Sequence, residues 1–140
     1  MKTQDNTKYQ KYRWFFTSSS KIVIGGKNAN QNEEIVGQAG EQEYVLHTAL
    51  PGSPFVNIKD DSKRVSKQEL KQAAVFCAKY SQAWKKSKVK GDIEVGVFLG
   101  KDIFKEALMK TGTFGVKKAK NIIVKKAEIR SFIENKKETD

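Results

Sequence analysis

The sequence predicts an α+β fold: one compact domain with a mostly antiparallel sheet, two main helices and a short C-terminal helix. Three observations lead to this prediction. The 140 residues suit one domain, and a hydrophobic content of 38% is enough for a core. Strand-like and helix-like segments mix without the regular alternation that is typical of parallel sheets. We expect the domain to occupy residues 11–137, after a loose polar arm at 1–10.

The first unit of the domain reads as two strands. Residues 12–17 are rich in aromatic side chains and favour a strand. A polar turn follows at 18–20, and residues 21–24 form the second strand. Neighbouring strand residues point to opposite faces, so one of Trp14 and Phe15 should point inward while the other is free to meet a partner.

A diglycine at 25–26 connects this unit to a helix. We expect the glycines to supply backbone angles that other residues avoid, or to let a ligand approach the backbone. Asn28 or Asn30 can cap the helix, and Gln31 or Glu33 can complete a capping box. The free N–H groups and the dipole of a helix start favour anions.

This turn carries a general phosphate signal rather than a nucleotide motif. Lys27 follows the diglycine, but neither a Walker A ending nor a G-x-G-x-x-G pattern is present. A simple strand-to-helix turn explains the same residues equally well.

The middle of the chain predicts two more strands. Residues 43–48 alternate enough to form one, and 55–58 form the other. Between them, the segment 49–54 is a tight loop in which Pro51-Gly52 suits a type II turn. Residues 59–64 are expected to be a charged surface connection.

The clearest helix of the sequence begins after Ser66. Ser66 and Glu69 form a capping box, and Val65 and Leu70 are placed as a hydrophobic staple. Apolar residues then recur at helical spacing, so we expect the helix to run to about Trp84.

The last third of the chain is less regular. Residues 93–99 have a strand-like composition, 101–109 are ambiguous, and 111–116 read as a turn with a short extended segment. We expect a last strand within 117–126 and a short helix at 126–137.

Charge is the strongest global property of the sequence. Lys and Arg total 27 against 16 acidic residues, which gives a net charge of +11. Such a chain favours polyanionic partners, namely RNA, DNA or acidic membrane surfaces, although a lysine-rich solvated surface is the plainer alternative. No apolar run of 18 residues predicts a membrane span, and no signal peptide is evident. One cysteine excludes an internal disulfide and favours a cytoplasmic chain.

Few side chains are candidates for chemistry. His47, the only histidine, can contact phosphate or base or move a proton, but a structural role is at least as common. Cys77 lies mid-face on the apolar helix and is expected to be buried and inert. One Cys, one His and dispersed carboxylates give no metal motif, so we expect neither a metal nor a cofactor.

Two lysine-rich segments, 85–90 and 117–126, complete the candidate surface. Lysines attract phosphates without base-specific readout. The two segments are solvated by default, and they would form a phosphate-tracking groove only if the fold brought them together.

The chain resembles the NFACT-R family, the RNA-binding domain of NFACT proteins that is also found as small standalone proteins. The matches keep their order over about residues 12–120 and comprise Arg13-Trp14-Phe15, Thr17-Ser18, Ile24-Gly25-Gly26-Lys27-Asn28-Ala29, Gln31-Asn32-Glu33, His47, Gly52-Ser53, Ala73-Ala74, Tyr80-Ser81, Ala83-Trp84, Gly112-Thr113-Phe114 and Lys117-Lys118. At position 28 the family often has Asp instead of Asn.

The resemblance implies a non-catalytic RNA-binding module that contacts tRNA or ribosomal RNA in translation quality control, with the large ribosomal subunit as a partner. It looks like that module alone, without the other NFACT domains, and we expect a monomer. The residues expected to contact nucleic acid are Arg13, Trp14, Gly25, Gly26, Lys27, Asn28, Gln31, Asn32, His47, Ser53, Lys85, Lys86, Lys117, Lys118 and Lys120.

Two other functions stay open at the level of sequence. One is an enzyme acting on nucleic acid, with His47 as acid or base and the diglycine turn holding phosphate. The other is a protein that binds DNA or an anionic surface. The charge of the chain is compatible with both.

Overall fold

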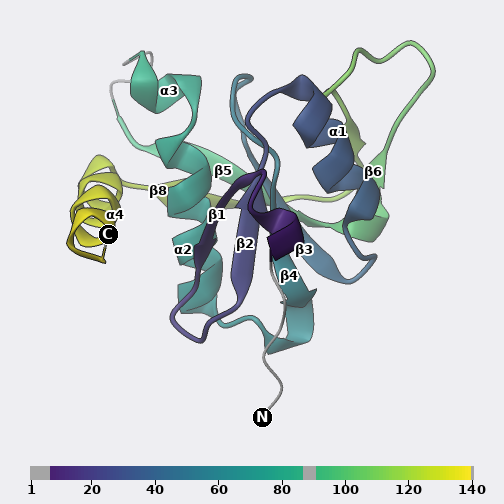
Figure 1. Cartoon of the computed structure of the whole chain (residues 1–140). Helices are drawn as coiled ribbons and strands as arrows, with labels where there is room; N and C mark the ends of the chain where they lie inside the picture. Colours follow the sequence, from purple (N-terminus) through teal and green to yellow (C-terminus); the bar gives the residue numbers. More distant parts are fainter. Residues whose placement is uncertain (1–6, 87–90, 140) are drawn as a thin grey trace.

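A six-stranded sheet organises the fold, in the order β1-β2-β4-β3-β5-β8 with antiparallel pairing throughout (Figure 1). The computed structural model describes residues 7–86 and 91–139. The strands of this sheet are β1 (Arg13–Phe16), β2 (Ile22–Gly25), β3 (Glu43–Thr48), β4 (Val56–Asp61), β5 (Ile93–Leu99) and β8 (Lys120–Val124). A second, two-stranded sheet pairs β6 (Ile103–Phe104) with β7 (Gly115–Val116).

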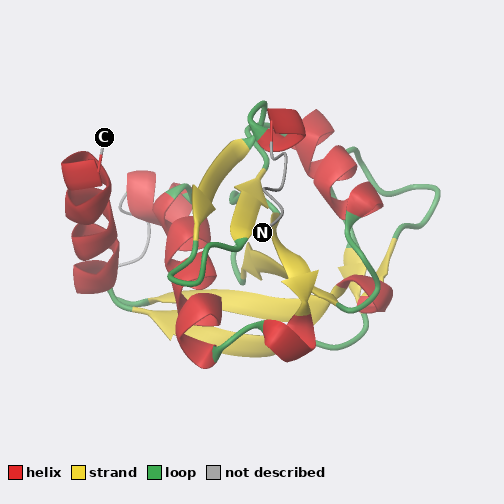
Figure 2. Ribbon diagram, turned by 60° about the horizontal axis from the view of Figure 1, so that its bottom comes forward, coloured by secondary structure: helices red, strands yellow, loops and turns green. Residues whose placement is uncertain are grey.

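Helices cover both faces of the large sheet (Figure 2). They are α1 (Ala29–Gln38), α2 (Lys67–Lys79), α3 (Gln82–Lys85) and α4 (Lys126–Thr139), and short 3-10 turns lie at η1 (Thr7–Tyr9), η2 (Ser62–Arg64) and η3 (Gly100–Asp102). Helices α2 and α4 pack on one face and α1 packs on the other. The predicted α+β class with a mostly antiparallel sheet is therefore confirmed.

Strand β2 shows how the two faces become two cores. All four of its residues are buried. Val23 points into the core under α2, whereas Ile22 and Ile24 point into the core under α1 with Ile35 and Phe55. Alternate residues of a strand face opposite sides, so a strand covered on both sides needs apolar residues at every position.

The described part of the N-terminal arm has structure of its own. Residues Thr7–Tyr9 form η1, and Tyr9 packs against the core under α1. Residues 1–6 lie outside the described part of the chain.

Three predicted boundaries differ from the structure. The segment 59–64 is not a surface connection, because β4 continues to Asp61 and pairs with β3. Helix α2 does not reach Trp84: it ends at Lys79, and Ser81 caps the separate helix α3 by accepting a hydrogen bond from the Trp84 N–H. The terminal helix α4 also extends beyond the expected residue 137, to Thr139.

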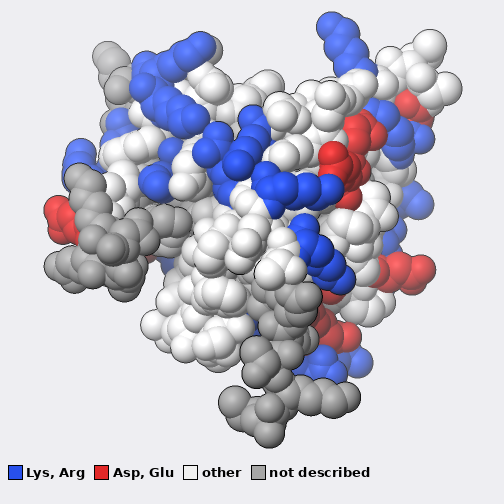
Figure 3. Space-filling model, viewed as in Figure 1, with Lys and Arg blue, Asp and Glu red and all other residues white. Residues whose placement is uncertain are grey.

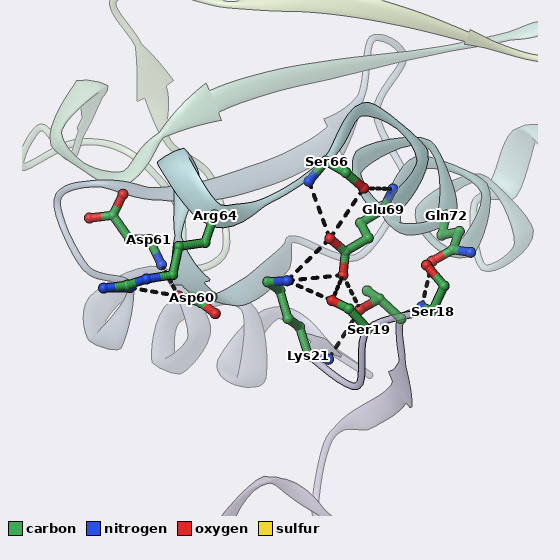
Figure 4. A network of polar contacts seen from close by, with 10 residues as sticks. Ser18, Ser19, Lys21, Asp60, Asp61, Arg64, Ser66, Glu69 and Gln72 are labelled. Atoms are coloured by element: carbon green, nitrogen blue, oxygen red, sulfur yellow. Dashed lines mark hydrogen bonds and ion pairs between the residues drawn. The ribbon is translucent and has the colours of Figure 1, made fainter.

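Glu69 is the centre of a polar network between the β1–β2 turn and α2 (Figure 4). The predicted capping box is present, because Ser66 Oγ accepts from the Glu69 N–H while Glu69 Oε1 accepts from the Ser66 N–H. The same carboxylate also accepts from Thr17 Oγ1 at 2.5 Å, from Ser19 Oγ and from Lys21 Nζ at 3.2 Å. The capping residue thus also fastens the first hairpin to the helix.

The pKa of Glu69 reflects this network. Burial alone would raise the pKa, but hydrogen bonds from Ser19, Thr17, Ser66 and Lys21 outweigh it and lower the pKa to about 2. Glu69 is therefore an ionised carboxylate with only 4% of its side chain exposed.

Candidate nucleic-acid interface

A groove of about 590 Å³ lies where the start of α1, the loop before β4, helix α3 and the segment around β7 meet. It brings together eight of the residues that the sequence singled out, namely Arg13, Gly26, Lys27, Asn28, Asn32, His47, Ser53 and Lys85. The start of α1 and His47 therefore share one side of the molecule, which the sequence could not establish.

The diglycine shapes this groove by close packing. Neither glycine has a positive φ, so the expectation of special backbone angles was wrong. A Cβ on Gly26 would collide with the side chain of Asn32, and one on Gly25 would lie 3.1 Å from the ring of Phe76. Gly25 thus packs against the core and does not line the groove. Asn32 holds the turn, because its Oδ1 accepts from the Phe55 N–H at 3.0 Å.

Helix α1 begins as predicted, with Asn28 Oδ1 accepting from the Gln31 N–H. Gln31 accepts from the Lys27 N–H rather than closing the capping box on Asn28, and its Nε2 donates to the Lys11 carbonyl. The Gly26 N–H donates to Phe55 O. Two of the N–H groups expected to hold a phosphate are therefore already bonded within the protein. Gln31 itself supports the turn and does not line the groove.

Three cationic side chains from three elements line the groove: Arg13 on β1, Lys27 before α1 and Lys85 on α3. The guanidinium of Arg13 stacks over the Tyr80 ring, 4.2 Å from its centroid. Lys85 Nζ lies 5.9 Å from the same centroid. Within the described residues the lining contains no Asp or Glu, and none of the ion pairs found there involves these three cations.

Lys and Arg side chains crowd the upper part of the surface in Figure 3, from the α3 side across to α1. Lys79 adds a further cation near the groove, because its Nζ lies 4.4 Å from the centroid of the Tyr80 ring, which lines the groove. Cations gathered in this way raise the local positive potential and attract polyanions.

His47 lies in the groove with its ring packed 4.4 Å from that of Phe55. Its Nδ1 is 2.7 Å from the Thr48 carbonyl, which can only accept, so Nδ1 carries the proton. Burial lowers the pKa of His47, and the carbonyl contact offsets this only in part. The neutral ring thus presents Nε2 as a hydrogen-bond acceptor.

The segment between β6 and β7 forms one wall of the groove and is held by Glu33 on α1. The Glu33 carboxylate accepts from Lys105 Nζ at 2.7 Å and from the Gly112 N–H at 2.6 Å. These contacts lower the pKa of Glu33. Gly112 has φ +80° and lies against Ala29, where a side chain would collide. Phe114 then packs on Phe55 with ring centroids 5.2 Å apart.

Ser53, which lines the groove, and Cys77, which does not, both have structural roles. Ser53 Oγ accepts from the Thr48 N–H and donates to Pro54 O, so it fixes the loop before β4. Gly52 in this loop has the positive φ expected of its turn. Cys77 is fully buried as expected, and burial raises the pKa of its thiol to about 12.

The remaining predicted residues do not line the groove. Trp14 is 36% exposed on the opposite face of β1 from Arg13, next to Phe16, while Phe15 points inward to Phe76. Lys86 is exposed at the end of α3. Lys117 and Lys118 lie between β7 and β8, and Lys120 is the first residue of β8. None of these three lysines lines the groove. Residues 87–90 of the first lysine-rich segment lie outside the described chain.

Sequence reasoning missed Gln82 and Phe114 as parts of the groove lining, and Glu33 as the residue that holds the segment between β6 and β7. Ser81 is a residue type that is typical of a helix N-cap, and it could have indicated that a short helix begins at Gln82. No local pattern connects Glu33 to Lys105, which is 72 positions away. Searches of the described residues found no group of His, Cys, Asp and Glu able to hold a metal ion, and no helix there is long and apolar enough to cross a membrane.

Sequence comparisons matched a family model and several relatives. The sequence model of a family described as NFACT protein RNA binding domain matches residues 11–118. An archaeal Rqc2 homolog from Methanocaldococcus jannaschii is 35% identical over 78 residues, covering 55% of this chain and 12% of the relative. The ribosome quality control complex subunit NEMF of Homo sapiens is 30% identical over 78 residues, covering 54% and 7%.

A solved structure shares the fold. The C-terminal part of the fibronectin/fibrinogen-binding protein from Streptococcus suis superposes with a TM-score of 0.73 at 24% identity, covering 94% of this chain and 50% of that one. This likeness concerns the fold alone. The aligned region makes up about a tenth of each curated relative.

Proposed function

The chain belongs to the family of NFACT protein RNA binding domains, and we propose that it is a non-catalytic module that binds tRNA or ribosomal RNA through the groove between α1 and α3. The proposal places it at the ribosome, since its relatives are named for ribosome quality control. The large ribosomal subunit is then a partner, and the module acts in the cytoplasm as a monomer.

The observation that carries the proposal is a concave surface with cations and no acids. Arg13, Lys27 and Lys85 converge on one groove, and its described lining has no Asp or Glu. A carboxylate would neutralise these cations and repel phosphate. Its absence leaves their attraction for a phosphate backbone undiminished.

Binding of a tRNA transcript and of ribosomal RNA fragments, followed by fluorescence anisotropy over a range of salt concentrations, tests this function. We expect steep weakening with salt. Each of Arg13→Ala, Lys27→Ala and Lys85→Ala should lower the salt slope by about one unit if the side chain meets a phosphate. Affinity no tighter than that for heparin, or equal affinity for a matched DNA, would contradict the proposal.

Lys63→Ala is the matched control. Lys63 is exposed on η2, before the first residue of α2, whereas Lys85 follows its end. A helix of 13 residues spans about 20 Å, so Lys63 is remote from the groove. A loss of affinity for Lys63→Ala as large as for the groove variants would mean that only net charge matters.

A further inference from the structure

Two residues that line the groove each have a buried polar side-chain atom with no hydrogen-bond partner among the described residues. These atoms are Nε of Arg13 and Oε1 of Gln82. Buried polar groups are almost always paired, because an unpaired one costs free energy. One is a donor and the other an acceptor, so a ligand that satisfies both must offer an acceptor and a donor.

Other residues in the lining of the groove are aromatic. The rings of His47 and Phe114 both pack on Phe55, at 4.4 and 5.2 Å between centroids. Both His47 and Phe114 are only partly buried, so their outer surfaces are open to the groove. Flat rings of this kind accommodate an unstacked nucleobase, and the free Nε2 of His47 can accept a hydrogen bond from its edge.

The dimensions favour one nucleotide. A volume of about 590 Å³ falls in the range of small-ligand pockets. A base can enter such a pocket only when it is unpaired and swung out of its helix. The cationic side chains in the lining, Arg13, Lys27 and Lys85, are then available for the phosphates on either side of that nucleotide.

We propose that the groove binds a single unpaired ribonucleotide of a structured RNA, with its base against His47 and Phe114 and with Gln82 Oε1 accepting a hydrogen bond from it. This inference rests on the proposed RNA-binding function and makes it specific for looped or bulged RNA. The donor to Gln82 is either an N–H of the base or the ribose 2′-hydroxyl, because both offer a hydrogen to an acceptor.

The test compares three hairpin RNAs by fluorescence anisotropy with the full chain at one salt concentration. The first is fully paired, the second carries a single-nucleotide bulge, and the third has a 2′-deoxy sugar at that bulge. We expect the bulged hairpin to bind about tenfold tighter than the paired one, as one well-stacked base is worth that much. If the deoxy hairpin loses the preference, the 2′-hydroxyl is the donor to Gln82. If the deoxy hairpin keeps the preference, the donor is an N–H of the base.

Variants locate the subsite. Gln82→Ala removes the proposed acceptor, and His47→Phe keeps a flat ring but removes Nε2. In both variants the ratio of the affinity for the bulged hairpin to that for the paired hairpin should fall towards one. The matched control Gln42→Ala alters an exposed glutamine before β3 and should keep the ratio. Circular dichroism confirms that each variant is folded.

Two results separate this inference from the function on which it rests. If both hairpins bind equally and with the same salt dependence, or if the preference persists in Gln82→Ala and His47→Phe, the nucleotide subsite is wrong while RNA binding stands. If neither hairpin binds more tightly than heparin, the RNA-binding function and the subsite both fail.

Discussion

The two ends of helix α2 handle charge in opposite ways. At its start, the carboxylate of Glu69 is buried and accepts hydrogen bonds from four residues, including the cation of Lys21 (Figure 4). Beyond its end, Arg13 and Lys79 contact the ring of Tyr80, and Lys85 lies 5.9 Å from its centroid, with no carboxylate in the described lining of the groove.

The difference separates structural charge from charge that is available for binding. A buried charge must be fully paired, and once paired it joins the segments that supply its partners. Here it joins the β1–β2 hairpin to α2. The exposed lysines of the groove, Lys27 and Lys85, need no partner, because water solvates them, and they keep a positive potential that an RNA phosphate can use.

The largest expected effect comes from removing the ionised carboxylate of Glu69 near the start of α2. Glu69→Gln removes the charge that balances Lys21, whose side chain is only 15% exposed, and leaves one acceptor oxygen where several donors converge. We expect a loss of about 3 kcal/mol in the free energy of unfolding, the cost of leaving one partner of a buried pair uncompensated. Urea denaturation measures it.

The matched control for that variant is Glu41→Gln. Glu41 is exposed and forms no ion pair in the described chain, so its replacement should change the free energy of unfolding by less than about 0.5 kcal/mol. Equal losses in both variants would show that the network around Glu69 carries no special stability.

Low pH should weaken the same network without a mutation, because it protonates the carboxylate of Glu69. The pKa of Glu69 is about 2 in the folded protein, against an ordinary value of 4.5. Between these values the unfolded chain binds a proton that the folded chain does not, so stability is complete above about pH 5 and falls as the pH drops towards 2. Urea midpoints measured from pH 6 to 2 should show a slope shallower by about one proton in Glu69→Gln than in the unchanged chain. Parallel slopes would contradict the assignment.

A carboxylate can also be introduced into the groove, where the described lining has none. Gln82→Glu places a carboxylate in the groove that holds Arg13 and Lys85. It should weaken binding of a tRNA transcript about tenfold, because the new charge repels phosphate and compensates the cations. The matched change Gln42→Glu adds the same charge at an exposed site and should have a smaller effect, as anisotropy at one salt concentration will show. Equal weakening would mean that net charge, rather than the groove, controls binding.

The smallest expected effect concerns the wall of the groove. Glu33→Gln weakens the contacts to Lys105 and to the Gly112 N–H that hold the segment between β6 and β7. We expect a loss of about 1 kcal/mol in local stability, in the range of one charge-assisted hydrogen bond at a surface. Hydrogen exchange of residues 105–116 should accelerate about fivefold while that of β3 stays unchanged. If residues 105–116 exchange no faster in Glu33→Gln than in the unchanged chain, Glu33 does not hold this segment.

Local elements were accessible from the sequence. Strands β3 and β5 were expected at 43–48 and 93–99, and the structure gives them those bounds. The capping box of Ser66 and Glu69 was likewise expected and confirmed. Alternation and capping depend on residues a few positions apart, so their signal is contained in the segment itself.

Some local expectations failed where tertiary contacts were decisive. Strand β4 runs on to Asp61 because β3 lies beside it, despite a charged sequence that suggested a connection. By contrast, Trp14 and Phe15 point in opposite directions as expected, and the outward Trp14 lies on the side of β1 away from the groove.

Most local segments, the basic charge and a family resemblance that links the start of α1 with His47 can be predicted from the residues alone. Which residues share the groove depends on tertiary contacts. Arg13 meets Tyr80 and Glu33 meets Lys105 through contacts that span 67 and 72 positions. Such contacts depend on the packing of both sheet faces, and no local pattern records them.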